Sequence, residues 1–254
     1  MTQTNTPLVE LKNISISFGG IRAVDNVSLN VEAGQVVGLL GHNGAGKSTL
    51  IKILSGAYQK DSGEIWIGGK KANIRSPRDA RNYNIETIYQ TLALADNLDA
   101  SSNLFLGREL TNTVGFVDDS QMQAETRKIM ARLNPNFKKL KEPVSALSGG
   151  QRQSVAIARA VYFDAKILIM DEPTAALGVH ETEMVANLIH ELKSQGFAII
   201  LISHDTREMM ELCDVVSVMK NGQMVGTELV EDVTEDEILS MIILGKKTSD
   251  AKVS

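Results

Sequence analysis

Residues 41–49 constrain this chain more than any other segment, because they fit the phosphate-binding loop pattern G-x-x-x-x-G-K-[ST]. The apolar run Val36–Leu40 before them is typical of a buried parallel strand, and residues 50–54 after them are typical of the first turns of a helix. A glycine loop between a strand and a helix points successive backbone N–H groups at an anion, and the helix N-terminus adds partial positive charge. The sequence therefore predicts a nucleotide-binding protein.

The fixed positions of this loop have separate expected tasks. Lys47 is expected to reach the terminal phosphates, and the Ser48 hydroxyl is expected to hold magnesium. A chance glycine-rich turn is the alternative, and the strand before the loop and the helix after it make that alternative weak. The residues expected to bind nucleotide here are Gly41, Asn43, Gly44, Gly46, Lys47, Ser48 and Thr49.

A second informative segment, Lys-Ile-Leu-Ile-Met-Asp-Glu-Pro, covers residues 166–173. Its apolar residues predict a buried strand that ends in two carboxylates, at the strand end where ligands of α/β sheets collect. Asp171 is placed to hold magnesium directly or through water, and Glu172 to take a proton from an attacking water. A solvated acidic turn is the alternative for this segment alone, and the phosphate loop makes it much weaker.

A third segment, Leu-Ser-Gly-Gly-Gln at residues 147–151, predicts a second anion site. Ser148 is a good N-cap for the helix that follows, and Gly149 and Gly150 expose backbone N–H groups beneath it, with Gln151 next in the chain. One chain does not need two cradles for the same phosphate. We therefore expect this cradle to close over a nucleotide held by another copy of the chain; the alternative is a helix start that is merely rich in glycine.

Composition excludes several classes of function. The 254 residues are 43% hydrophobic and 22% charged with a net charge of −5, and no lysine- or arginine-rich block indicates nucleic-acid binding. Cys213 is the only cysteine, so no disulfide framework or cysteine metal site is expected, and it reads as a small buried hydrophobe. No apolar stretch approaches the roughly 18 residues of a membrane span, and the polar start lacks a signal-peptide core. We expect a cytoplasmic chain whose membrane role comes through a partner.

Hydrophobic patterning predicts an α/β core with two additions. Alternating runs at 9–18, 27–31 and 64–67 predict a small antiparallel sheet near the N-terminus. Continuous apolar runs typical of parallel strands, separated by helical patterns, lie at residues 36–40, 85–89, 167–170 and 198–202. Between about 91 and 148 this rhythm stops, and residues 120–133 have helical spacing, which indicates an inserted helical subdomain.

Together these motifs resemble the ATP-binding subunit of ABC transporters, over residues 8 to 245. The resemblance implies a P-loop NTPase (RecA-like) core with an N-terminal antiparallel β subdomain and an inserted helical subdomain. We therefore expect a single domain over 1–254, with the core at about 8–91 and 149–245, the helical subdomain at about 92–148 and a polar tail at 246–254. The implied cofactors are ATP and Mg²⁺.

The resemblance also assigns roles that the residues alone do not. Phe18 matches the aromatic residue that stacks on adenine, although taken alone it reads as a strand-end core residue. Gln90 matches the glutamine that senses magnesium and the attacking water and links to the membrane subunit. His204 matches the histidine that contacts the γ-phosphate, whereas a lone histidine at a strand end is more often structural. The implied metal ligands are Ser48, Gln90 and Asp171, and the implied catalytic residues are Glu172, His204, Gln90 and Lys47.

In proteins of this kind two subunits hold two ATP molecules between the phosphate loop of one copy and the Leu-Ser-Gly-Gly-Gln segment of the other. Closing on ATP and opening after hydrolysis drives a transmembrane permease. One departure from the family pattern is Gly178, which stands where an aspartate is expected to bridge the dimer interface. This departure puts the aspartate's role in doubt here and leaves ATP binding and the Glu172 chemistry as expected.

Residues 92–98, 103–109 and 174–179 resemble the monosaccharide-import branch, of fructose, ribose or xylose type. We therefore expect a homodimer with competent sites, peripheral at the cytoplasmic face of the cell membrane, that energises sugar uptake through a separate permease supplied by a sugar-binding protein. The alternatives are a soluble ABC ATPase without a permease, as in iron–sulfur cluster assembly, and an ABC ATPase for another small solute. The sugar-importer-like segment from 92 to 109 favours transport.

Overall fold

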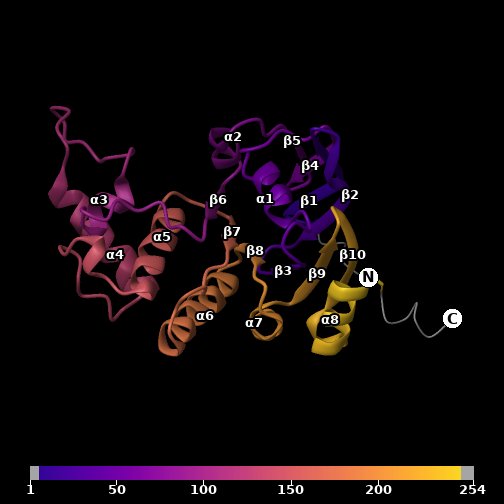
Figure 1. Ribbon diagram of the computed structural model, residues 1–254. Coiled ribbons are helices and arrows are strands. Elements are labelled where there is room, and N and C mark those ends of the chain that lie inside the picture. Colours follow the sequence, from indigo (N-terminus) through magenta and orange to yellow (C-terminus); the bar gives the residue numbers. More distant parts are fainter. Residues whose placement is uncertain (1–5, 247–254) are drawn as a thin grey trace, which may run out of the picture. The chain divides into compact units, whose positions relative to one another are not determined.

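A computed structural model describes residues 6–246 of the chain (Figure 1). The described residues divide into two compact units, the first made of 6–87, 166–172 and 192–246, and the second of 88–165 and 173–191. The boundaries predicted for the core and the helical subdomain stay a prediction. The polar tail predicted at 246–254 lies outside the described residues, apart from Lys246.

The first unit begins with the antiparallel sheet that the alternating runs predict. Its strands are β1 (Val9–Phe18), β2 (Ile21–Val31), β4 (Ser62–Ile67) and β5 (Lys70–Ala72), in the spatial order β2-β1-β4-β5. Every second or third side chain of β1, from Val9 to Ile16, is buried, and the polar residues between them point outward. The antiparallel subdomain is therefore confirmed.

The larger sheet of this unit has six strands and is mostly parallel. Its spatial order is β10 (Gln223–Leu229), β9 (Val215–Lys220), β3 (Val36–Leu40), β8 (Ala198–Ile202), β7 (Ile167–Asp171) and β6 (Ile85–Ile88). Strands β3 and β8 are buried along their whole length, as expected for strands covered on both faces. The predicted P-loop NTPase core is confirmed, while β9 and the antiparallel edge strand β10 were not predicted.

Helices cover both faces of the larger sheet within the first unit. Figure 1 shows α1 (Lys47–Leu54) and the small sheet on one side, and α7 (Thr206–Leu212) and α8 (Glu235–Leu244) on the other. The short helix α2 (Pro77–Asn82) begins at the capping residue Ser76. One continuous core joins buried residues of α1, the small sheet and the larger sheet, so the start of α1 is rigidly held next to the end of β3.

The second unit contains α3 (Ala100–Phe105), α4 (Asp119–Leu133), α5 (Gly149–Tyr162) and residues 179–191 of α6 (Val179–Ser194). Helices α3, α4 and α5 pack against one another (Figure 1). The apolar face of α4 is buried at Met122, Ile129, Met130 and Leu133, and the Phe105 ring lies 4.8 Å from that of Tyr162 in an edge-on contact. The helical spacing in the sequence of this region corresponds to the buried apolar face of α4.

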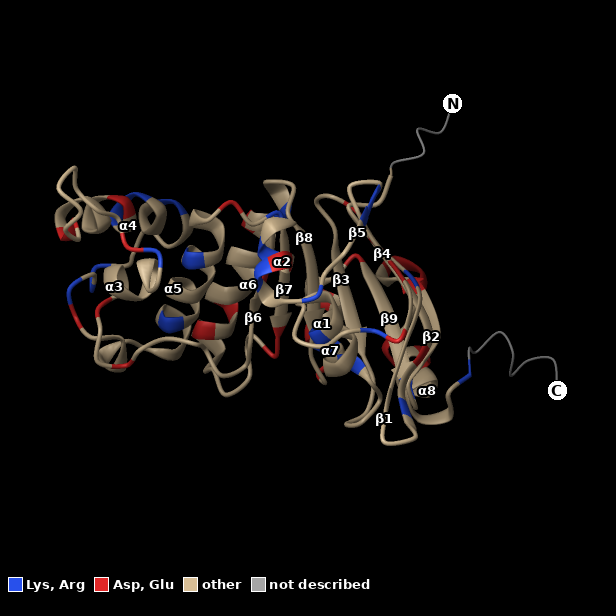
Figure 2. Cartoon of the chain, turned by 90° about the horizontal axis from the view of Figure 1, so that it is seen from above, with Lys and Arg blue, Asp and Glu red and all other residues tan. Residues whose placement is uncertain are grey.

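The length of the helices and the distribution of charged residues can be described for this part of the chain. Among residues 6–246, every helix is too short or too polar to cross a lipid bilayer. Figure 2 shows Lys and Arg, and Asp and Glu, scattered along the ribbon of both units.

Candidate nucleotide-binding site

The phosphate loop joins the end of β3 to the start of α1, and its glycines meet steric demands. A Cβ on Gly41 would stand 2.2 Å from the carbonyl oxygen of Met219, and one on Gly46 would stand 2.5 Å from that of Ala23. Gly46 also has φ +103°, in the region that favours glycine, at the N-cap of α1. The loop encloses a pocket of about 160 Å³ lined by Ala23 and residues 43–49, which suits phosphate groups rather than a whole nucleotide.

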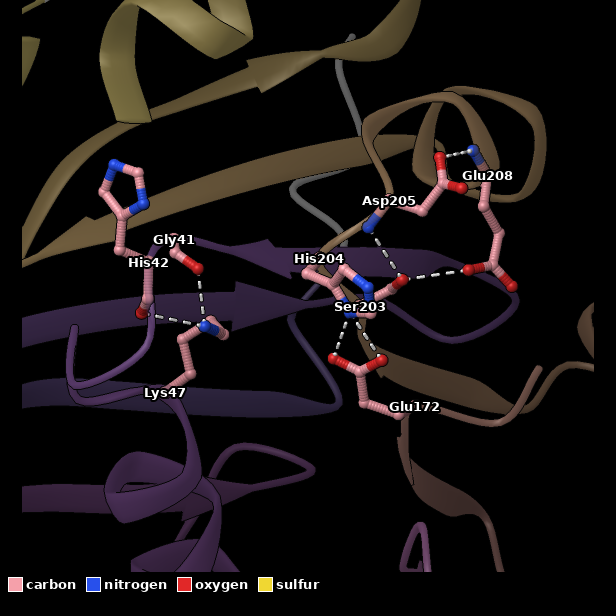
Figure 3. A network of polar contacts seen from close by, with 8 residues as sticks. All are labelled: Gly41, His42, Lys47, Glu172, Ser203, His204, Asp205 and Glu208. Atoms are coloured by element: carbon pink, nitrogen blue, oxygen red, sulfur yellow. Dashed lines mark hydrogen bonds and ion pairs between the residues drawn. The ribbon is translucent and has the colours of Figure 1, made fainter. Parts of the chain in front are cut away.

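Lys47 occupies the centre of this loop. Its side chain is nearly buried, and its ammonium group donates to the carbonyl oxygens of Gly41 at 2.6 Å and His42 at 3.2 Å (Figure 3). Burial lowers the pKa of the Lys47 ammonium, while the negative charges of Glu172 and Asp171 oppose that shift. Because the buried Lys47 ammonium interacts with two carboxylates, the loop is suited to bind an anionic phosphate that carries a metal ion.

The register of two parallel strands brings Glu172 and His204 together. Asp171 at the end of β7 pairs with Ile202 at the end of β8, and the Glu172 N–H donates to the Ile202 carbonyl at 2.8 Å. Glu172 directly follows β7 and His204 is the second residue after β8, so the two residues lie beside each other. His204 Nδ1 lies 2.9 Å from Oε1 and 2.8 Å from Oε2 of Glu172 (Figure 3).

Glu172 holds an unusual backbone conformation for this contact. Its φ is +52°, in the left-handed region that costs a non-glycine residue of the order of 1 kcal/mol or more. The hydrogen bond and charge of Glu172 raise the pKa of His204, which favours the imidazolium form. The His204 side chain is 75% exposed and that of Glu172 is 18% exposed, so His204 is the member of the pair that faces solvent.

Neighbouring residues that the sequence analysis missed hold the His204 loop. The Ser203 hydroxyl donates to Glu208 Oε2 at 2.9 Å and accepts from the Asp205 N–H at 3.1 Å. The Asp205 carboxylate accepts from the Arg207 and Glu208 N–H groups at 2.9 and 3.2 Å and so caps α7 (Figure 3). An aspartate just before a helix start is an N-cap signal, so the sequence did contain a clue to this support.

The oxygen donors near the loop fit magnesium. Burial raises the pKa of the half-buried Asp171, the adjacent Glu172 charge raises it further, and Lys47 and Lys52 oppose these effects. Among the described residues, groups of three or more His, Cys, Asp or Glu that could hold a metal are absent. Mg²⁺ is usually bound by one or two carboxylates together with substrate phosphates, so a hydroxyl at Ser48 and a carboxylate at Asp171 suit an ion that arrives with the nucleotide.

Phe18 lies at the end of β1 with 45% of its surface exposed, so it is not the core residue that a strand end alone would suggest. Its ring packs edge-on against Tyr58, with centroids 5.2 Å apart and an interplanar angle of 64°. The Lys52 ammonium lies 5.3 Å from the Tyr58 ring centroid. The exposed ring of Phe18 has the character that adenine stacking needs, while the part-buried Tyr58 packs against the core behind it.

The predicted second anion site lies in the second unit. Ser148 caps α5 and forms a capping box with Gln151, whose side chain accepts from the Ser148 N–H at 3.1 Å. A Cβ on Gly149 or Gly150 would stand 2.4 Å from Leu177 or Met184, so both glycines also allow close packing. Ser148 and Gln151 line a groove of about 800 Å³ together with the first turns of α6.

Two further predicted residues also belong to the second unit. Gln90 follows β6 and is exposed. Gly178 precedes α6, and its carbonyl oxygen accepts from the Thr182 N–H at 2.9 Å, so Gly178 has the N-cap position of that helix. The catalytic, nucleotide-binding and metal-binding roles assigned from the sequence stay predictions.

Comparisons with known proteins identify the family of the chain and proteins of similar fold. The family model described as ABC transporter matches residues 24–175. The chain is 43% identical over 242 residues to the xylose/arabinose import ATP-binding protein XylG of Sulfolobus acidocaldarius, covering 94% of this chain and 96% of that protein. It is 42% identical over 237 residues to the ribose import ATP-binding protein RbsA of Caldanaerobacter subterraneus subsp. tengcongensis, but spans only 48% of that protein's length while 93% of this chain is covered.

The fold is similar to that of a solved nucleotide-free ATP-binding cassette from an ABC transporter. The TM-score is 0.81 at 27% identity, covering 92% of this chain and 96% of that one.

Proposed function

The chain belongs to the ABC transporter family, and from that membership we propose that it is the ATP-hydrolysing subunit of an importer that energises monosaccharide uptake through a separate membrane permease. The names of the relatives support the cargo class, since they are import proteins for xylose and arabinose or for ribose. The sugar itself would contact other polypeptides, so its identity is not encoded in this chain's site.

The observation that carries the ATPase part of the proposal is the Glu172–His204 pair. The backbone of Glu172 is in the left-handed region, and its carboxylate lies 2.8 Å from the His204 imidazole. Both residues belong to the same unit as the phosphate loop. Strain of this kind persists where the surrounding structure maintains it, and it is concentrated at functional sites. The influence of Glu172 on the pKa of Lys47 supports a common site for the pair and the loop.

Each residue then has a task in ATP hydrolysis. Loop N–H groups and Lys47 bind the β- and γ-phosphates, and Phe18 stacks on adenine. Ser48, Asp171 and Gln90 would hold Mg²⁺, which would supply positive charge to neutralise the phosphate oxygens. Glu172 takes a proton from the attacking water, and His204 keeps the Glu172 carboxylate oriented while it contacts the γ-phosphate.

The second cradle completes the site in a homodimer. Ser148, Gly149, Gly150 and Gln151 would bind the γ-phosphate of a nucleotide that a second copy holds in its phosphate loop. Closure of this sandwich on ATP, and its opening after hydrolysis, would move the permease between its states. The chain would lie peripherally at the cytoplasmic face of the membrane, and a sugar-binding protein would supply the permease.

Affinity purification of the tagged chain from detergent-solubilised membranes tests this proposal. We expect a multi-span permease among the partners identified by mass spectrometry, encoded beside a sugar-binding protein. A parallel purification of the Lys47→Ala variant controls for nonspecific recovery and for dependence on nucleotide. Recovery of soluble partners alone would overturn the transport part in favour of a soluble ABC ATPase, and a permease for another solute would overturn the cargo class.

A further inference from the structure

One carboxylate of the second unit lies at the start of two helices. Glu181 is in the first turn of α6, and its Oε2 accepts from the Gly178 N–H at 3.3 Å. The same Oε2 lies 3.4 Å from the position that a Cβ on Gly149 would take, and the Glu181 Cβ lies 3.2 Å from that position on Gly150. The side chain therefore spans from the N-terminus of α6 to the N-terminus of α5.

This carboxylate contacts the donors that form the second anion cradle. The Ser148 hydroxyl holds the pKa of Glu181 below its usual range, and the Gly178, Gly150 and Gly149 N–H groups lower it further. Glu181 is therefore ionised at neutral pH. The Ser148 hydroxyl, whose oxygen also accepts from the Gln151 N–H at 3.4 Å, and the Gly149 and Gly150 N–H groups are therefore the donors of this turn that an anion would share with Glu181.

The local sequence explains why Glu181 reaches this position. A glutamate three residues after an N-cap usually pairs with a capping side chain, but Gly178 at the N-cap of α6 has none. Nothing stands within 4 Å of the place where a Cβ on Gly178 would lie, so the space beside the carboxylate is open. The departure from the family aspartate at residue 178 and the position of Glu181 are thus parts of one local arrangement.

We propose that Glu181 is an internal anion that occupies the second cradle when no nucleotide is presented there, and that it must leave before a second copy can close its ATP on this cradle. The inference rests on the proposed function, because it takes the cradle as the site for that γ-phosphate. A phosphate and a carboxylate repel each other and compete for the same N–H donors. Glu181 therefore raises the ATP concentration needed for dimer closure without changing the phosphate loop.

The test compares ATP-driven dimerisation in variants of the full chain. Glu181→Gln removes the charge but keeps a side chain that can still accept from the Gly178 N–H and so keep α6 capped. Glu183→Gln is the matched control, because Glu183 is exposed, lies on α6 and lines the same groove. All variants carry Glu172→Gln, which slows hydrolysis, and sedimentation velocity gives the ATP concentration for half-maximal dimer.

We expect Glu181→Gln to lower this concentration about tenfold, the difference between a charged and a neutral hydrogen-bonded competitor. The control should match the parent, and the ATP dissociation constant of the monomer, measured with a fluorescent analogue, should be equal in all. A parent that dimerises with ATP and a Glu181→Gln variant that does so no more easily would overturn the inference and leave the proposed function intact.

A parent that binds ATP without ever dimerising would overturn the ATP-sandwich part of the proposed function, and this inference with it. Circular dichroism melting of each variant detects misfolding, and Glu181→Asp provides a second variant if Glu181→Gln is unfolded. Because aspartate keeps the charge on a shorter side chain, its contact with the cradle is weakened, and we expect an intermediate shift in the ATP concentration.

Discussion

Replacing Glu172 with glutamine separates the chemistry of the site from its stability. The change keeps the size of the side chain and its backbone conformation, but removes the proposed base and the negative partner of His204, whose Nδ1 lies 2.8 Å from Oε2. The His204 side chain is 75% exposed, so the pair is worth about 0.2–1 kcal/mol to folding, as exposed ion pairs are. For a chain of this size we expect Tm to fall by about 4 °C at most.

The effect on turnover should be much larger than the effect on folding. A positioned general base contributes about 100- to 10,000-fold to a rate, which corresponds to about 2.7–5.4 kcal/mol of barrier. We expect kcat, measured by phosphate release, to fall within that range while the ATP dissociation constant stays within about threefold of the parent value. A kcat within tenfold of the parent would refute Glu172 as the base, and a large loss of ATP affinity would assign Glu172 to binding instead.

Two further changes and one titration test other parts of the site. Lys47→Ala removes a buried ammonium from the phosphate loop and should weaken ATP binding at least about tenfold by calorimetry; an unchanged dissociation constant would remove Lys47 from the phosphate site. Gly46→Ala places a Cβ 2.5 Å from the Ala23 carbonyl oxygen at φ +103°, so thermal unfolding should show a loss of about 2 kcal/mol or more, and a parent-like Tm would contradict this steric argument. The pKa of His204 is raised by Glu172, so the pair's contribution to stability is complete below the unfolded pKa of about 6.5 and is lost as pH rises through the folded pKa. NMR titration of His204 should show its pKa falling in Glu172→Gln, and an unchanged pKa would mean that another group causes the shift.

The main elements of the fold were predictable because their patterns are local. Strands Val36–Leu40 and Ala198–Ile202 lie where the residues indicate, since each is a continuous apolar run. Strand β10 was missed because it is a sheet edge with few buried side chains, and its residues lack a strong alternation. Its neighbour β9 was missed despite a mostly buried apolar run that the same reasoning could have found.

The candidate site was partly predictable for a related reason. Motif residues such as Lys47 and Glu172 follow from spacing, but the contact between Glu172 and His204 depends on the register of β7 and β8. The contact of Glu181 with Ser148 and the glycines of α5 depends on tertiary packing between segments that are distant in sequence. Such contacts leave no periodic signal in a single sequence, so only the three-dimensional structure identifies them.

The most direct test of the central claim is ATP-driven sugar uptake by vesicles that contain this chain and the permease that purifies with it. Radiolabelled monosaccharides are offered with the sugar-binding protein, and ATP is enclosed on the side where the chain is bound. We predict uptake that requires ATP and is abolished when the chain carries Glu172→Gln. Continued ATP hydrolysis without uptake of any monosaccharide, or uptake that is unaffected by Glu172→Gln, would contradict the account.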